Sequence, residues 1–135
     1  MIGIDTNVLV RYFTQDDPVQ GPLAQRFVLH TLSPENRGHV SLVCLAELVW
    51  VLNSRYRVSI EVIVDAISKL LVDARFLVQD ARAVWAALDA YQQGLAEFAD
   101  ALIAALDRQH GCLHTVTFDQ RAARLPGMVL LESVS

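Results

Sequence analysis

The sequence predicts an α/β fold in which a mostly parallel sheet is covered by helices on both faces. Apolar runs of strand length occur at residues 1–4, 39–41, 112–116 and 129–131, and residues 76–78 form either a further strand or an extended connection. Segments with helix signals separate these runs, so strands and helices alternate at both ends of the chain. Parallel strands need long crossovers, usually helical, and such sheets are buried on both faces.

Helix boundaries follow from capping residues and helix-ending glycines. Ser and Asp side chains accept hydrogen bonds from the free amides of a first helical turn, and Gly commonly follows the last turn. We therefore expect one helix directly after residues 5–7 and others that begin at Asp17 with Pro18, Ser41, Ser59, Asp80 and Glu97. The last five end near residues 32, 56, 71, 94 and 110, and a helical turn follows at 120–124.

The length and composition fit a single globular domain over residues 1–135. Hydrophobic residues make up 53% of the chain and charged residues 19%, which suits one buried core. Apolar runs fall far short of the roughly 20 residues of a membrane span, so we expect a cytoplasmic protein without membrane association. Cys44 and Cys112 lie in apolar runs and are expected to be buried thiols. The net charge of -4 argues against a generally basic nucleic-acid-binding surface but allows a local one.

Four acidic residues stand where apolar segments meet turns or helix starts: Asp5, Glu47, Asp100 and Asp119. Buried carboxylates are costly unless a cation or hydrogen-bond donors compensate their charge. Asp5 and Asp119 each follow a predicted strand, which places both at the carboxyl edge of a parallel sheet. Carboxylate oxygens suit Mg²⁺ and related divalent cations. The pattern predicts an assembled metal site.

Each of these acids also has a structural interpretation. Asp5 and Asp119 can cap helices, Asp100 can stabilise a helix N-terminus, and Glu47 can be a surface residue. In the metal-site interpretation, Thr6 or Asn7 orients the carboxylate of Asp5. Tryptophans at helical spacing are more often core residues than nucleic-acid platforms, so we expect Trp50 and Trp85 in the core. Three arginines are plausible phosphate contacts outside the predicted site: Arg11, Arg55 and Arg121.

The sequence resembles the PIN-domain family, in particular the VapC-type toxins of bacterial type II toxin-antitoxin pairs. The resemblance covers nearly the whole chain and depends on the order and spacing of four short motifs. These are Ile4-Asp5-Thr6-Asn7-Val8-Leu9-Val10, Ala46-Glu47-Leu48, Ala99-Asp100-Ala101-Leu102-Ile103-Ala104-Ala105 and Thr117-Phe118-Asp119.

The resemblance implies a three-layer α/β/α sandwich and a metal-dependent endoribonuclease that uses Mg²⁺ or Mn²⁺. The family's acidic positions, catalytic and metal-binding, match Asp5, Glu47, Asp100 and Asp119, and its supporting polar positions match Asn7 and Thr117. Many members carry another acid shortly after the last one, where this chain has Gln120 and Arg121. The resemblance further implies an RNA substrate, a homodimer and a cognate antitoxin whose tail blocks the acidic groove.

Two other functions remain open. Non-toxin PIN domains process RNA with the same acids, so the chain can be a processing nuclease and not a toxin. Alternatively, the acids form a non-catalytic surface that binds a basic partner peptide and cleaves no bond. A metal-independent complex with such a peptide, without nuclease activity, would distinguish the last function from the first two.

Overall fold

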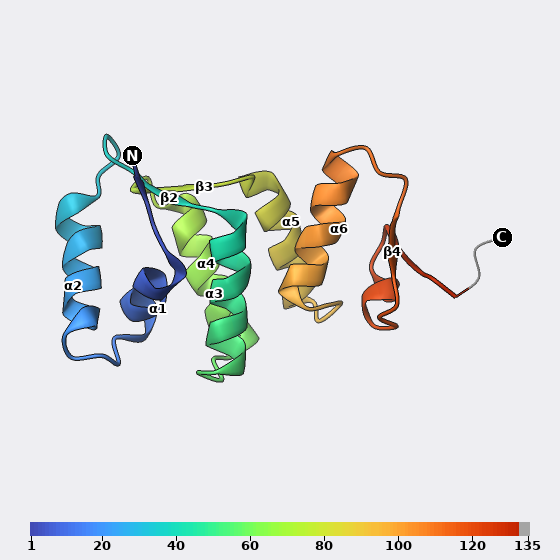
Figure 1. Ribbon diagram of the computed structural model, residues 1–135, viewed down its shortest axis with the longest axis horizontal. Helices are drawn as coiled ribbons and strands as arrows, with labels where there is room; N and C mark the ends of the chain where they lie inside the picture. The colour runs from blue at the N-terminus through green and yellow to red at the C-terminus, as the bar shows by residue number, and fades with distance from the viewer. Residues whose placement is uncertain (133–135) are drawn as a thin grey trace. The chain divides into compact units, whose positions relative to one another are not determined.

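The computed structural model describes residues 1–132 and divides the chain into two compact units, Met1–Gln79 (unit 1) and Asp80 onward (unit 2). Figure 1 traces the elements of both units, and each unit is described by itself. Residues 133–135 of the expected domain lie outside the described part. Among residues 1–132, no helix combines the length and the apolar character that crossing a membrane requires.

Unit 1 contains a parallel sheet of three short strands in the order β1-β2-β3. The strands are β1 (Ile2–Gly3), β2 (Gly38–Val40) and β3 (Phe76–Val78), and Gly38 lies opposite both Ile2 and Phe76. The expected parallel strands are therefore confirmed, including the one at residues 76–78. The second strand begins and ends one residue earlier than expected, because Ser41 caps the next helix.

Gly38 is required by close packing at the start of the central strand. It is buried, and a Cβ atom added there would collide with the side chains of Ile4 and Leu32. Its backbone amide donates a hydrogen bond of 2.8 Å to the carbonyl oxygen of Arg75. The first strand and the central strand thus approach each other closely just before Asp5.

The helices of unit 1 begin near their predicted caps. They are α1 (Thr6–Thr14), α2 (Gln20–Arg26), α3 (Leu42–Ser54) and α4 (Ile60–Val72), and a π-helical turn, η1 (Phe27–Thr31), continues α2. Ser41 accepts a hydrogen bond from the amide of Cys44, and Ser59 accepts one from that of Val62. Asp17 accepts hydrogen bonds of 2.9 and 2.7 Å from the amides of Val19 and Gln20. Local capping chemistry therefore sets these helix starts.

The core of unit 1 joins its helices to the sheet. Helix α1 packs against α2 and α3, and α4 packs against β3 and α3. The largest fully buried side chains there come from α1, η1, α3, α4 and β2: Leu9, Val28, Val40, Leu45, Leu48, Ile63, Ile67 and Leu70. This packing fixes α1, which begins directly after Asp5, and α3, which carries Glu47 in its second turn.

Unit 2 consists of two packed helices and a second parallel pair of strands. The helices are α5 (Ala81–Gln92) and α6 (Phe98–Gln109), and the strands are β4 (Thr115–Thr117) and β5 (Met128–Leu130). A 3₁₀ turn, η2 (Ala122–Arg124), lies between the strands. Tyr91 and Phe98 pack edge to face in the helical core, with ring centroids 6.1 Å apart.

The end of α6 delays the strand that follows it, so the expected strand at residues 112–116 begins at Thr115. Gly111 has a positive φ of 89°, its amide bonds to Arg108 O, and the Cys112 amide bonds to Asp107 O. These two bonds form a Schellman motif, which keeps Cys112 in the helix end. Cys112 is consequently exposed, whereas Cys44 is buried, and the expectation of two buried thiols is wrong for Cys112.

Candidate metal centre

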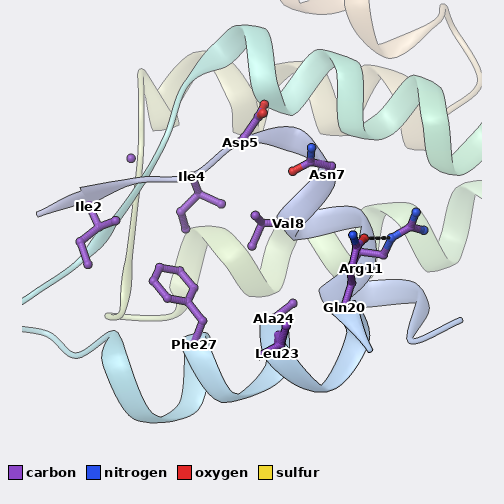
Figure 2. Close-up of a pocket in the computed structure, with 11 residues that line it drawn as sticks. Ile2, Ile4, Asp5, Asn7, Val8, Arg11, Gln20, Leu23, Ala24 and Phe27 are labelled. Carbon is purple, nitrogen blue, oxygen red and sulfur yellow. Dashed lines mark hydrogen bonds between the residues drawn. The ribbon is translucent and has the colours of Figure 1, made fainter. Parts of the chain in front are cut away.

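Asp5 lies at the junction of β1 and α1 and caps the helix. The Ile4 amide is bonded to His39 O at 3.0 Å, and Asp5 Oδ1 accepts a hydrogen bond of 2.8 Å from the Thr6 amide. The capping role of Asp5 is therefore confirmed. Its Oδ2 makes no hydrogen bond within unit 1, and the side chain is exposed. Figure 2 shows the Asp5 carboxylate directed away from Phe27, with Asn7 nearby at the start of α1.

Glu47 is connected to α1 through Thr6. The buried Thr6 hydroxyl donates a short hydrogen bond to Glu47 Oε1, which links the first turn of α1 to the second turn of α3. Burial raises the pKa of the adjacent Cys44 thiol; the Thr6 hydrogen bond lowers it, and the charges of Asp5 and Glu47 raise it further. Asp5 and Glu47 therefore both lie near Cys44, close enough for their charges to raise its pKa, and Thr6 orients Glu47.

Two hollows flank the start of α1. One has a volume of about 460 Å³ and is mainly apolar, with Ile2, Ile4, Val8, Leu23 and Phe27 in its wall (Figure 2). The other has a similar volume of about 460 Å³ and is formed by α1, α3 and the residues after α3. We call this second hollow the α1–α3 groove; its polar and aromatic lining includes Asp5, Asn7, Arg11, Glu47, Trp50 and Arg55.

Asp100 lies in the first turn of α6 and is half-buried. Its pKa is raised by this burial, then by the negative charge of Asp119 and that of Glu97, while Arg121 opposes the shift. The structure of unit 2 thus places Asp100 close enough to Asp119 for their charges to repel. A carboxylate in this position is stabilised by a nearby cation.

Asp119 follows β4, and its side chain caps the turn that leads into η2. Its Oδ1 accepts hydrogen bonds of 2.8 and 3.0 Å from the amides of Arg121 and Ala122, while the Thr117 hydroxyl oxygen accepts one of 3.0 Å from the Asp119 amide. The capping interpretation of Asp119 is confirmed, and its Oδ2 makes no hydrogen bond within residues 80–132. Arg121 also forms an ion pair of 2.9 Å with Glu97.

The predicted acids are therefore found as two pairs, Asp5 with Glu47 in unit 1 and Asp100 with Asp119 in unit 2. Within either unit, as far as residue 132, no group of three or more His, Cys, Asp or Glu has the geometry of a metal site. Sequence reasoning missed the role of Thr6 toward Glu47, because the two residues are 41 positions apart. The three-residue spacing of Glu97 and Asp100 allows both to face the same way, although a capping or solvating role for Glu97 was the favoured interpretation; the negative charge of Glu97 does act on Asp100.

Two expectations about burial are wrong. Asp5, Glu47 and Asp119 are exposed in the structure, and only Asp100 is partly buried. Trp50 and Trp85 are 57% and 44% exposed and do not belong to the core. Asp5, Glu47 and Asp119 are thus accessible to solvent, and solvation lowers the cost of their charges.

The PIN-domain family model matches residues 2–128, a range that includes all four acids. The chain belongs to the PIN-domain family. The match confirms the predicted α/β sandwich class with a central parallel sheet, and PIN domains are in general metal-dependent nucleases. None of the curated proteins compared with the chain matches it.

Proposed function

We propose that this PIN-domain protein is an endoribonuclease that hydrolyses RNA phosphodiester bonds with Mg²⁺ or Mn²⁺. Asp5, Glu47, Asp100 and Asp119 would hold the metal, supported by Asn7 and Thr117. The pairing of the acids within each unit carries this proposal, since two acids far apart in sequence share one region in each case. The family match over residues 2–128 supports the nuclease chemistry.

The residues fit a divalent cation by the chemistry of their donors. All four side chains offer carboxylate oxygens, the ligands that Mg²⁺ and Mn²⁺ prefer. Asp5 and Asp119 each use one oxygen as a cap and keep the other free of hydrogen bonds within their units. Burial first, and then the negative charges of Asp119 and Glu97, raise the pKa of Asp100, and Arg121 only partly offsets the effect of these charges. A divalent cation would relieve that repulsion.

The chain's own residues would orient the acids for this chemistry. A bound divalent cation lowers the pKa of a coordinated water and stabilises negative charge on the phosphate. Thr6 restricts Glu47 through its hydroxyl, and the Thr117 hydroxyl oxygen holds the backbone of Asp119 by accepting a hydrogen bond from the Asp119 amide. Because such neighbours fix the direction of ligand oxygens, we assign Thr6 and Thr117 positioning roles.

Within this proposal, residues 1–135 form one PIN-like domain. The single family match that runs through both units supports this arrangement. We further propose a cytoplasmic homodimer that acts as a VapC-type toxin and is inhibited by a cognate antitoxin. The motif resemblance supports the toxin assignment, and a non-toxin RNA-processing nuclease is the alternative with the same site.

The nuclease proposal is tested by incubating the purified full chain with a panel of structured RNAs in Mg²⁺, Mn²⁺ or EDTA. We expect cleavage with either metal, none in EDTA, and a loss of about 100-fold or more in Asp100→Asn. Asp89→Asn is the matched control, because Asp89 is an exposed acid on α5 outside the site. Absence of cleavage under every condition, with a basic peptide bound equally in EDTA, would support the non-catalytic acidic module.

The toxin assignment needs a separate measurement in growing cells. Induced expression of the wild-type chain should arrest bacterial growth, whereas Asp100→Asn should not. RNA cleavage in vitro without growth arrest would favour the processing nuclease over the toxin.

A further inference from the structure

The α1–α3 groove continues beyond the acids to groups that the proposed hydrolysis does not use. Arg11, Arg55 and Tyr56 line the same hollow as Asp5 and Glu47. Thr6 meets Glu47 near the start of α1, whereas Arg11 meets Tyr56 more than one turn later. The groove therefore has an acidic end and a basic end.

The spacing along α3 gives the length of the groove. Glu47, Val51 and Arg55 are each four residues apart, so they follow one face of the helix into its C-cap. Eight residues at 1.5 Å each separate Glu47 from Arg55 by about 12 Å. At about 3.4 Å per stacked nucleotide, this separation covers roughly three nucleotides.

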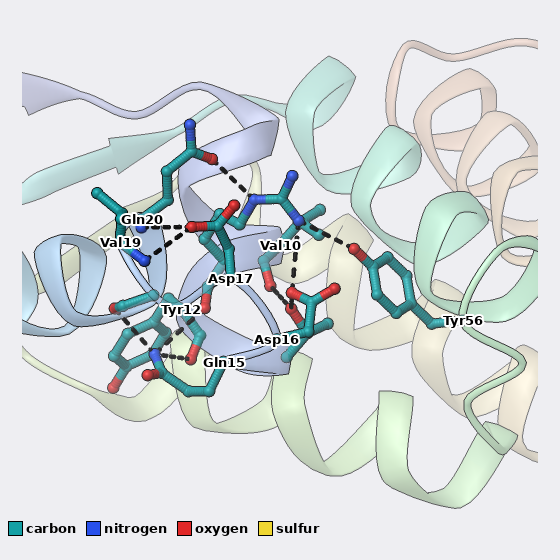
Figure 3. A network of polar contacts seen from close by, with 11 residues as sticks. Val10, Tyr12, Gln15, Asp16, Asp17, Val19, Gln20 and Tyr56 are labelled. Carbon is teal, nitrogen blue, oxygen red and sulfur yellow. Dashed lines mark hydrogen bonds and ion pairs between the residues drawn. The ribbon is translucent and has the colours of Figure 1, made fainter.

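Arg11 is held in place with one edge of its guanidinium group free. Its Nε donates to Gln20 Oε1 at 2.8 Å, and its Nη1 donates to the Tyr56 hydroxyl at 3.0 Å and to Asp16 Oδ1 at 3.4 Å (Figure 3). Its Nη2 has no hydrogen-bond partner within unit 1. A pre-oriented guanidinium group with free donors is suited to phosphate.

Trp50 and Arg55 form an exposed pair on the same groove. The Trp50 side chain is 57% exposed, and the Arg55 guanidinium carbon lies 5.7 Å from the centroid of its ring. Arg55 forms no ion pair within unit 1, so its charge is available to an anion. Solvent-exposed aromatic rings beside arginines are stacking platforms for unpaired bases.

We infer that the α1–α3 groove binds single-stranded RNA, with backbone phosphates on Arg11 and Arg55 and one base stacked on Trp50. This inference extends the proposed function: the acidic end holds the scissile phosphate, and the basic end holds the strand about three nucleotides away. A duplex does not fit this role, because its bases are stacked on one another and cannot reach Trp50. An acidic peptide would use the arginines but not the exposed indole face.

Trp50 itself reports binding, since Trp85 is the only other tryptophan. The measurement uses the full chain with Trp85→Phe and Asp100→Asn in Mg²⁺, titrated with a short single-stranded RNA. We expect the Trp50 fluorescence to be quenched, and no quenching when Trp50→Phe leaves Trp85 alone. No quenching of Trp50, or equal quenching by polyglutamate, would overturn the inference.

Arginine variants test the phosphate contacts by salt dependence, with RNA binding followed by fluorescence anisotropy. Arg55→Ala should make the slope of log affinity against log salt less negative by about 0.7, the value for one contact to single-stranded nucleic acid. Arg26→Ala removes an exposed arginine of α2 that does not line the groove, and should leave the slope unchanged. Equal slopes for the wild type and Arg55→Ala would contradict the assignment.

Cleavage kinetics separate this inference from the proposed nuclease function. In the otherwise wild-type chain, Trp50→Ala should raise KM for RNA at least fivefold and leave kcat unchanged, because stacking on Trp50 contributes equally to binding of the substrate and of the transition state. Cleavage with an unchanged KM would overturn the groove inference and leave the nuclease in place. RNA-dependent quenching without cleavage in any metal would overturn the nuclease and retain the binding groove.

Discussion

The two acidic pairs are built differently. In unit 1, Glu47 is tied to Thr6 by a hydrogen bond, and Asp5 caps α1 in an exposed position. In unit 2, Asp100 is half-buried beside Asp119 and Glu97, and its pKa is raised. The first pair is thus oriented by hydrogen bonds, whereas the second retains repulsion between like charges. The contrast shows that two pairs of carboxylates from the same sequence can differ: hydrogen bonds orient one pair, and repulsion between like charges persists in the other.

The largest expected effect is the loss of cleavage when either pair loses an acid. The two pairs differ in how the same substitution changes thermal stability. Asp5→Asn and Asp100→Asn should each reduce RNA cleavage by about 100-fold or more, since loss of a metal ligand costs several kcal/mol in the transition state. Asp100→Asn should raise Tm, because it removes a repelled, partly buried charge. Asp5→Asn should leave Tm unchanged, because Asn caps helices equally well. Calorimetry measures the Tm of each variant, and the cleavage assay measures its activity. Equal increases in Tm for the two variants would show that the two pairs do not differ in charge repulsion.

The next effect concerns the hydrogen bond that orients Glu47. Thr6→Val keeps the buried shape but removes the hydroxyl, so we expect cleavage to fall about tenfold. Stability should fall by about 1 kcal/mol, the typical value of one such bond. Thr6→Ser is the control that keeps the donor. Wild-type cleavage by Thr6→Val would show that Glu47 needs no orientation by α1.

A structural acid provides the opposite electrostatic case. Hydrogen bonds with Arg75 lower the pKa of Asp73, and the shortest contact is 2.7 Å. Its contribution to stability, about 1 kcal/mol, is therefore complete above the ordinary carboxyl pKa and is lost as the pH falls through the lowered folded value. Urea unfolding from pH 7 to pH 2 should show a smaller acid-induced loss for Asp73→Asn than for the wild type. An equal loss of stability with falling pH in Asp73→Asn and the wild type would refute this contribution of Asp73.

The smallest effect is expected at the surface of unit 2. Arg121 and Glu97 form an ion pair of 2.9 Å, but their side chains are 50% and 60% exposed. Exposed pairs contribute about 0.5 kcal/mol or less in most cases. Arg121→Ala should therefore change the free energy of unfolding by no more than this amount in a denaturant titration. A loss of 2 kcal/mol or more would mean that Arg121 holds the Asp119 turn together.

Local chemistry allowed much of the fold to be predicted from the sequence. The caps at Ser41 and Ser59 and the polar turn after the first strand depend on near neighbours, and the structure has them where we expected them. Parallel pairing followed from the alternation of strands and helices. The capping roles of Asp5 and Asp119 were likewise visible as alternatives in the sequence.

The remaining features depend on contacts that a linear pattern does not contain. Helix α3 is apolar on most sides, so periodicity could not decide that Trp50 faces outward. The bond between Thr6 and Glu47 joins helices that are distant in sequence. Exposure of Cys112 depends on how α6 ends, because the Schellman bonds extend past the last apolar helical residue. The pKa of an acid also depends on tertiary packing: burial and the charges of Asp119 and Glu97 raise the pKa of Asp100.

The close approach at Gly38 has a genetic consequence. Any larger residue there must displace Ile4, the residue that directly precedes Asp5, as well as Leu32. A screen for loss-of-function alleles should therefore recover Gly38 substitutions beside changes in the acids, although Gly38 carries no functional group. Second-site suppressors of such alleles would be found at Ile4 or Leu32, where a shorter side chain restores the space and with it the position of the first strand.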